Sequence, residues 1–188
     1  MRWLGLYARS RQVPTSAAAV LLVGLAVWAL VEPGPSDLGT AVLVLGANVV
    51  AASVGLGGQD VLLERTAAIR WLPRRVAHVL LIGAVAGAAL LAVQSVGTEL
   101  APTGVVVRDS AGLVGLAALG AVLCGAQLAW TLPTGWLAAA LLVPVPGGTT
   151  GKVLNWMIFP TGTTASDWTA WTLLATGTVA YALAGPRR

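Results

Sequence analysis

Charged side chains are scarce in this chain, since they make up 10% of its 188 residues, whereas apolar side chains make up 57%. A soluble domain of this size carries about 25% charged residues. Too little charge is therefore left to cover a surface in water, and the composition predicts a protein embedded in a membrane.

Cysteine and histidine are almost absent, because Cys124 and His78 are the only residues of their kinds. A single cysteine excludes an internal disulfide and a cysteine-based metal cluster. A single histidine excludes a histidine pair as a metal site. Both residues lie in apolar runs, where packing explains them better than a reactive thiol or a proton relay does.

The seven acidic residues avoid the centres of the apolar runs. Acids inside a membrane mark ion and proton pathways, so their absence there argues against a proton-driven carrier. The eleven basic residues give the chain a net charge of +4. They form short clusters between apolar runs and no patch that would bind nucleic acid.

Six apolar runs predict one all-α, polytopic transmembrane domain over residues 1–188. Only helices satisfy their own backbone groups in lipid, and a crossing helix needs about 20 residues. Five runs meet that length, whereas the fifth in chain order is short and either crosses with a proline break or stops early. The runs are 15–31, 38–56, 76–96, 111–132, 136–145 and 166–184.

The basic residues predict that both ends of the chain lie in the cytoplasm. With that orientation, nine basic residues fall in cytoplasmic segments, and only Arg108 and Lys152 fall outside. Such an excess of inner positive charge is the usual signal of membrane orientation. Because Arg187 then lies on the same side as Arg2, the number of spans is even.

Two cytoplasmic segments have patterns of their own. Residues 1–14 place apolar and aromatic side chains on one helical side and arginines on another, which predicts a short interfacial helix. Residues 57–75 form the longest cytoplasmic connection and bring Asp60, Glu64 and Arg65 within about a helical turn. These charges indicate either a contact with a partner or a solvated loop that only sets the topology.

The connection 146–164, predicted to lie outside, is rich in glycine, threonine and proline but contains Trp156-Met157-Ile158-Phe159. Such apolar content predicts a segment that re-enters the membrane or packs over the bundle, with Trp156 shielded from water. Its stretch 147–152 (GGTTGK) resembles a phosphate-binding loop. The glycine spacing is one residue too short and the serine or threonine that follows lysine is missing, so no ATP site is predicted.

Three amide side chains lie within the predicted spans, at Asn48, Gln94 and Gln127. Each needs a hydrogen-bond partner in hydrocarbon. They either join helices to one another or line a path for an amphipathic substrate.

The order of these segments resembles that of the six-helix membrane subunits of ABC exporters of the type-two permease class. In that class an amphipathic helix precedes the first span, a coupling helix joins spans two and three, and a partly re-entrant segment lies outside between spans five and six. The matching segments here are 1–14, 57–75 and 146–164, with Leu132-Pro133-Thr134-Gly135 as the short inner connection between spans four and five. The stretches 60–67, 125–130 and 178–187 are also similar to short, Ala-rich permease-like proteins of GC-rich bacteria.

The resemblance implies a transport subunit of a bacterial inner membrane that is not itself an enzyme and needs no cofactor. A separate cytoplasmic ABC ATPase would contact Asp60, Glu64 and Arg65, and a second permease subunit would complete the transporter. The exported substrate would be apolar or amphipathic, because the spans offer no charge to an ion. A non-transporting membrane scaffold, immunity or regulatory subunit is the alternative.

Overall fold

The computed structural model describes residues 13–30, 38–53, 56, 71–97, 99–144 and 147–187. The predicted coupling segment lies mostly outside these residues, with Asp60, Glu64 and Arg65 among the residues that are not described. The predicted interfacial helix at 1–14 lies outside them as well, except for its last two positions.

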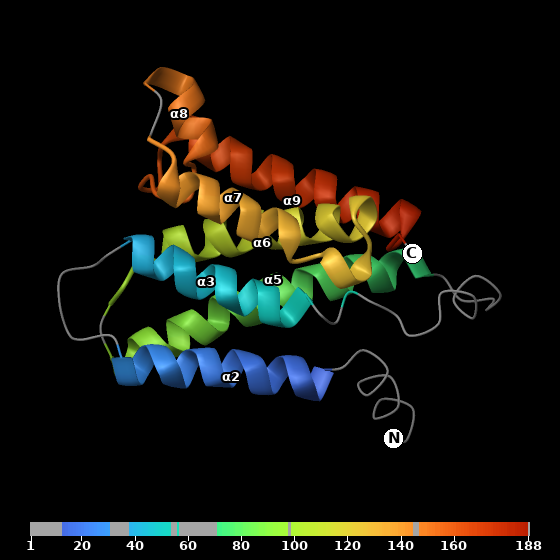
Figure 1. The fold of residues 1–188 in the computed structure, drawn as a ribbon, viewed down its shortest axis with the longest axis horizontal. Helices are drawn as coiled ribbons and strands as arrows, with labels where there is room; N and C mark the ends of the chain where they lie inside the picture. The colour runs from blue at the N-terminus through green and yellow to red at the C-terminus, as the bar shows by residue number, and fades with distance from the viewer. Residues whose placement is uncertain are drawn as a thin grey trace.

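The described chain is all-helical, as its composition predicts, and no described residue lies in a strand. Six helices run along one bundle in alternating directions (Figure 1). A 3-10 turn, η2, follows the fourth of them, and a short helix, α8, precedes the last. The elements are α2 (Val13–Leu30), α3 (Leu38–Ser53), α5 (Trp71–Val96), α6 (Thr103–Leu123), η2 (Ala126–Leu128), α7 (Thr131–Leu142), α8 (Gly148–Leu154) and α9 (Thr164–Ala184).

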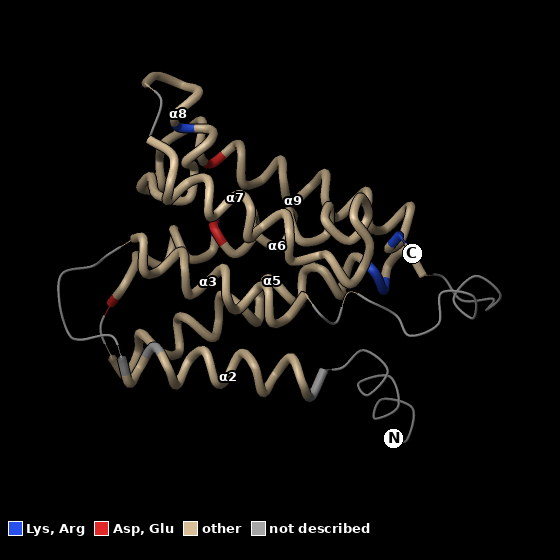
Figure 2. Tube along the Cα trace, in the orientation of Figure 1, with Lys and Arg blue, Asp and Glu red and all other residues tan. Residues whose placement is uncertain are grey.

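Charged residues gather at the two ends of the bundle (Figure 2). At the end where α5 begins and α9 ends, called the Arg75 end, the described charges are Arg74, Arg75 and Arg187. The opposite end, called the α8 end, holds both signs. Its described charges are Glu99, Arg108, Asp109, Lys152 and Asp167.

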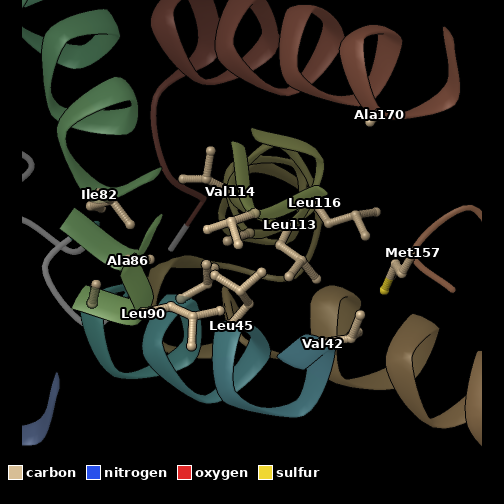
Figure 3. Close-up of a cluster of buried hydrophobic side chains, with 14 of the residues drawn as sticks. Val42, Leu45, Ile82, Ala86, Leu90, Leu113, Val114, Leu116, Met157 and Ala170 are labelled. Atoms are coloured by element: carbon tan, nitrogen blue, oxygen red, sulfur yellow. The ribbon is translucent and has the colours of Figure 1, made fainter. Parts of the chain in front are cut away.

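Helix α6 is the centre of the bundle, because 14 of its 21 residues are buried and it contacts α3, α5, α7 and α9. Figure 3 shows side chains of α3 and α5 packed against Leu113 and Val114 of α6. Glycines bring the backbones close together. Gly83 and Gly87 of α5 lie against the α6 side chains of Val114 and Ser110, where an added Cβ would come within about 3 Å of these side chains.

Two of the described helices are long and apolar enough to cross a membrane. Helix α5 has 26 residues and a mean hydropathy of 2.4, and α6 has 21 residues and a mean hydropathy of 1.6. The sequence predicted six such spans. Helices α3 and α7 have only 16 and 12 residues, which is short of the length that a crossing helix needs.

The predicted boundaries of the fourth span and of the connection after it differ from the structure. The sequence predicted this span at residues 111–132, whereas the structure has a helix from Thr103 to Leu123. Gly125 ends this region with a φ of 104°, a left-handed conformation that side chains with a Cβ rarely adopt. The chain therefore turns over residues 124–130, and the predicted connection 132–135 lies inside α7.

Candidate functional site

A buried ionic cluster lies at the α8 end and consists of Arg108, Asp109 and Asp167, here called the Arg108 cluster. Arg108 and Asp109 lie near the start of α6 with 2% and 0% of their surface exposed. Arg108 Nε donates to Asp109 Oδ1 at 2.8 Å, and Arg108 Nη1 to Asp167 Oδ1 at 3.3 Å. One guanidinium thus faces two carboxylates from two helices.

The Arg108 cluster also fastens the connection between α8 and α9. Arg108 Nη2 donates to the Phe159 carbonyl at 2.7 Å, and Nη1 to the Pro160 carbonyl at 3.2 Å. The Gly162 N–H donates to Asp167 Oδ2 at 3.0 Å. Charge-assisted hydrogen bonds of this kind are the stronger ones in proteins, so the cluster holds this connection against α6 and α9.

Residues 155–163, here called the α8–α9 connection, follow α6 from its middle back to its start. The Trp156 ring fills the space over Gly112, and Thr161 contacts Gly104. These two glycines are about 12 Å apart along a helix. Trp156 has 0% of its surface exposed, so the prediction that this segment packs on the bundle with Trp156 shielded is confirmed.

A second set of contacts lies at the Arg75 end. Here the last turns of α9 form hydrogen bonds with Leu56 and with Arg75 in the first turns of α5. The Tyr181 hydroxyl donates to the Leu56 carbonyl at 2.6 Å, and Arg75 Nη1 donates to the Ala182 carbonyl at 3.3 Å. Leu56, which precedes residues 57–70, is fully buried.

A groove of about 360 Å³ lies on the side of the bundle between α5, α6 and α9. Small residues of α5 and α6 form part of it, and larger apolar residues complete its lining. Ser110 is its one hydroxyl, and that Oγ donates to the Val107 carbonyl at 3.0 Å. The lining is Leu80, Gly83, Ala84, Gly87, Ala88, Leu91, Val107, Ser110, Ala111, Val114, Trp171 and Leu174.

The three predicted substrate-path amides are not brought together. Asn48 lies in the middle of α3 with 1% of its surface exposed, and neither of its side-chain polar atoms has a partner. Gln94 lies near the α8 end, where its Nε2 donates to the Ala101 carbonyl at 2.8 Å. Gln127 is exposed in η2 at the Arg75 end. None of the three lines the groove.

The Arg108 cluster is the feature that the sequence analysis missed. The sequence predicts that Arg108 lies outside the membrane in a connecting segment, whereas the structure places Arg108 and Asp109 within the first two turns of α6. A signal was present in the sequence. Pro102 precedes an apolar stretch that continues in helical register past residue 110, which is typical of a helix start.

The fold and its contacts define an all-helical bundle with a central buried helix and apolar outer faces. Comparison with protein-family models, with curated proteins and with solved structures finds no match.

Proposed function

We propose that this chain is the membrane-spanning subunit of an ABC exporter in a bacterial inner membrane. The observation that supports membrane embedding best is that residues 79–93 of α5 are apolar on all sides. Its buried face includes Val79 and Ile82, while Leu80 and Leu81 on the opposite side are 48% and 58% exposed. A helix that is apolar all round is typical of a membrane span or of the core of a large protein.

The described charges support an orientation with the Arg75 end in the cytoplasm. Arg74, Arg75 and Arg187 lie there, and no described residue at that end is acidic. Basic residues concentrate on the cytoplasmic side of membrane proteins, whereas acids contribute little to orientation. The α8 end, with its mixed charges, then faces outward.

In this proposal, helices that are too short to cross the membrane alone are supported by neighbouring segments that fill the remaining depth. Helix α7 has 12 residues and is therefore about 18 Å long, against about 30 Å of hydrocarbon. The α8–α9 connection would occupy membrane depth beside it. Irregular backbone at such depth is tolerated where it is buried in protein, and Trp156 is fully buried here.

The proposed motor is a separate cytoplasmic ATPase that contacts the segment containing Asp60, Glu64 and Arg65. Its closing would displace residues 57–70, and Leu56 and Arg75 would pass that displacement to α9 through Tyr181 and Ala182. Helix α9 packs closely along α6. The same helix holds Asp167 at its opposite end, so one rigid element would link the motor contact to the Arg108 cluster.

We assign the substrate to the groove between α5, α6 and α9 and not to the three separate amides. In a membrane the open side of the groove would face lipid, and the hydroxyl of Ser110 is the only one in its otherwise apolar lining. An apolar or amphipathic molecule fits this lining, because no described residue of the groove is charged. A second permease subunit would close the groove from the other side.

Reconstitution with a candidate cytoplasmic ABC ATPase from the same bacterium tests the proposal. The double variant Asp60→Ala/Glu64→Ala should reduce ATPase retention on the purified chain at least tenfold, because paired charges set register at interfaces. Glu99→Ala is the matched control, since it removes an exposed acid at the α8 end. If no ATPase binds the wild-type chain, or if the double variant binds and transports normally, the proposed motor contact is wrong.

A non-transporting scaffold, immunity or regulatory subunit is the second candidate. The observation that favours it is the tight packing of α6 on α9, where Gly115 and Gly177 leave no room for a Cβ atom. A rigid core of this kind suits a passive role. Binding of the ATPase without substrate-stimulated hydrolysis would support the scaffold over the transporter.

A further inference from the structure

We propose that the Arg108 cluster is a proton-binding site, with the proton on Asp109, and that this proton holds the α8–α9 connection against α6. The inference concerns the α8 end of the bundle and does not depend on a motor subunit. It starts from an imbalance of charge, because one guanidinium lies between two carboxylates in a buried site.

The hydrogen bonds identify which carboxylate takes the proton. Both oxygens of Asp167 have donors, since Oδ1 accepts from Arg108 and Oδ2 accepts from the Gly162 N–H. Asp109 has only one such bond, from Arg108 Nε to Oδ1. Its Oδ2 is buried without a partner, so a proton on that oxygen removes an uncompensated charge from the interior.

Exposure agrees with this assignment. The Asp167 side chain is 31% exposed and remains in contact with the surroundings, whereas the Asp109 side chain is 0% exposed. Taking an ionised carboxylate out of water costs several kcal/mol unless every lone pair finds a donor. Of the two carboxylates, the fully buried Asp109 therefore suits the protonated form.

No other described charge faces Asp109. Helices α3 and α7 and the α8–α9 connection contain no titratable side chain. The titratable residues of α5 are Arg74, Arg75 and His78, which lie at the Arg75 end. Lys152 of α8 has an exposed side chain, and Glu99 is exposed in the connection between α5 and α6.

A proton fits the site better than a metal ion does. The described residues contain no group of three histidine, cysteine or acidic side chains that could hold a metal. A metal ion would also lie beside the Arg108 guanidinium, whose positive charge repels it. A proton needs a single oxygen, and Asp109 Oδ2 supplies it.

Loss of the proton would change the contacts of Arg108. Two ionised carboxylates would then share one guanidinium, and the Asp109 carboxylate would draw water into the cluster. The bonds from Arg108 to the Phe159 and Pro160 carbonyls would weaken, and Trp156 would leave its place over Gly112. Water reaches the cluster along Asp167, whose side chain is the exposed member.

Infrared spectroscopy of the purified full-length chain in nanodiscs tests the site directly. At neutral pH the wild-type protein should show the carbonyl band of a buried, protonated carboxylic acid, and Asp109→Asn should abolish it. Asp167→Asn should retain the band, because Asp109 stays buried and its Oδ2 still has no donor. Glu99→Gln, which removes an exposed carboxylate at the same end, should retain the band.

The position of Trp156 gives an independent readout. Fluorine NMR of the chain with fluorine-labelled tryptophan follows this residue, and the Trp156 signal is assigned by its loss in Trp156→Phe. Raising the pH should make that signal accessible to a water-soluble quencher in the wild-type chain. Asp109→Asn imitates the protonated form and should keep Trp156 shielded throughout. A wild-type protein without the protonated-acid band, or a folded Asp109→Asn protein that still shows it, would overturn the proposal.

Discussion

Gly177 of α9 lies directly on the carbonyl group of Gly115 in α6, so that a Cβ atom at position 177 would overlap backbone atoms. The contact is reciprocal, because a Cβ at Gly115 would overlap the backbone at Leu173 and Leu174. Helices approach this closely only where both lack side chains. The close approach sets the line along which α9 crosses α6, and hence the place where Asp167 meets Arg108.

Gly177→Ala should destabilise the bundle by about 2 to 3 kcal/mol, since the added methyl group meets backbone that cannot move aside. The measurement is unfolding in mixed detergent, followed by helical content. Gly135→Ala is the matched control, because Gly135 lies within α7 with nothing in reach of an added Cβ. That variant should be neutral or up to about 1 kcal/mol more stable. Equal behaviour of the two variants would contradict the close packing of α6 on α9.

Gly112→Ala should displace Trp156, because the added Cβ would lie where the indole ring sits. Trp156 should become accessible to an aqueous quencher, although the tryptophan itself is unchanged. Trp156→Ala should cost about 3 to 5 kcal/mol of folding free energy, as expected for a large buried side chain. Trp168→Ala, at a position that is 69% exposed, should change it by about 0.5 kcal/mol or less. Shielding of Trp156 that survives Gly112→Ala would refute this packing.

Cysteine labelling of intact cells should give the orientation of the bundle. The exposed Cys124 is first replaced by alanine. Glu99→Cys and Thr150→Cys should then react with a membrane-impermeant reagent from outside. Arg74→Cys and Arg187→Cys should react only after permeabilisation. All four positions are exposed, so a reversed pattern would mean a reversed orientation, and reaction at all four in intact cells would exclude embedding.

Tyr181→Phe should weaken the link between α9 and the residues before the coupling segment. The Leu56 carbonyl is buried and would lose the hydroxyl that donates to it at 2.6 Å. An unsatisfied buried acceptor costs about 1 to 3 kcal/mol. Thr176→Val is the control, because the Thr176 hydroxyl only bonds carbonyls of its own helix. If both variants unfold like the wild-type chain, Tyr181 does not hold Leu56.

The positions of several helices could be predicted from the apolar runs in the sequence. The predicted runs 38–56 and 166–184 correspond to Leu38–Ser53 and Thr164–Ala184. Proline, glycine and charged residues interrupt the apolar runs, and they also end helices. The opposite directions of α5 and α6 follow in turn, because only a short connection lies between Val96 and Thr103.

The Arg108 cluster could not be predicted in the same way. The sequence of a charged pair beside an apolar run is the same whether the pair faces water or a buried partner. Arg108 and Asp167 are 59 positions apart, and they meet only because α9 crosses α6 at the Gly115–Gly177 contact. The same holds for Tyr181 and Leu56, which are 125 positions apart.

Composition and the apolar runs alone thus determined that the described part of the chain is helical and apolar, and where α2, α3 and α9 begin and end to within about three residues. These properties depend on each residue's own transfer free energy and backbone preference, which are local. Tertiary structure decided that α6 is central, that Trp156 reaches its middle, and that one arginine serves two carboxylates. Those outcomes depend on which faces of distant helices fit together, and that fit is set by side-chain volumes across the interface.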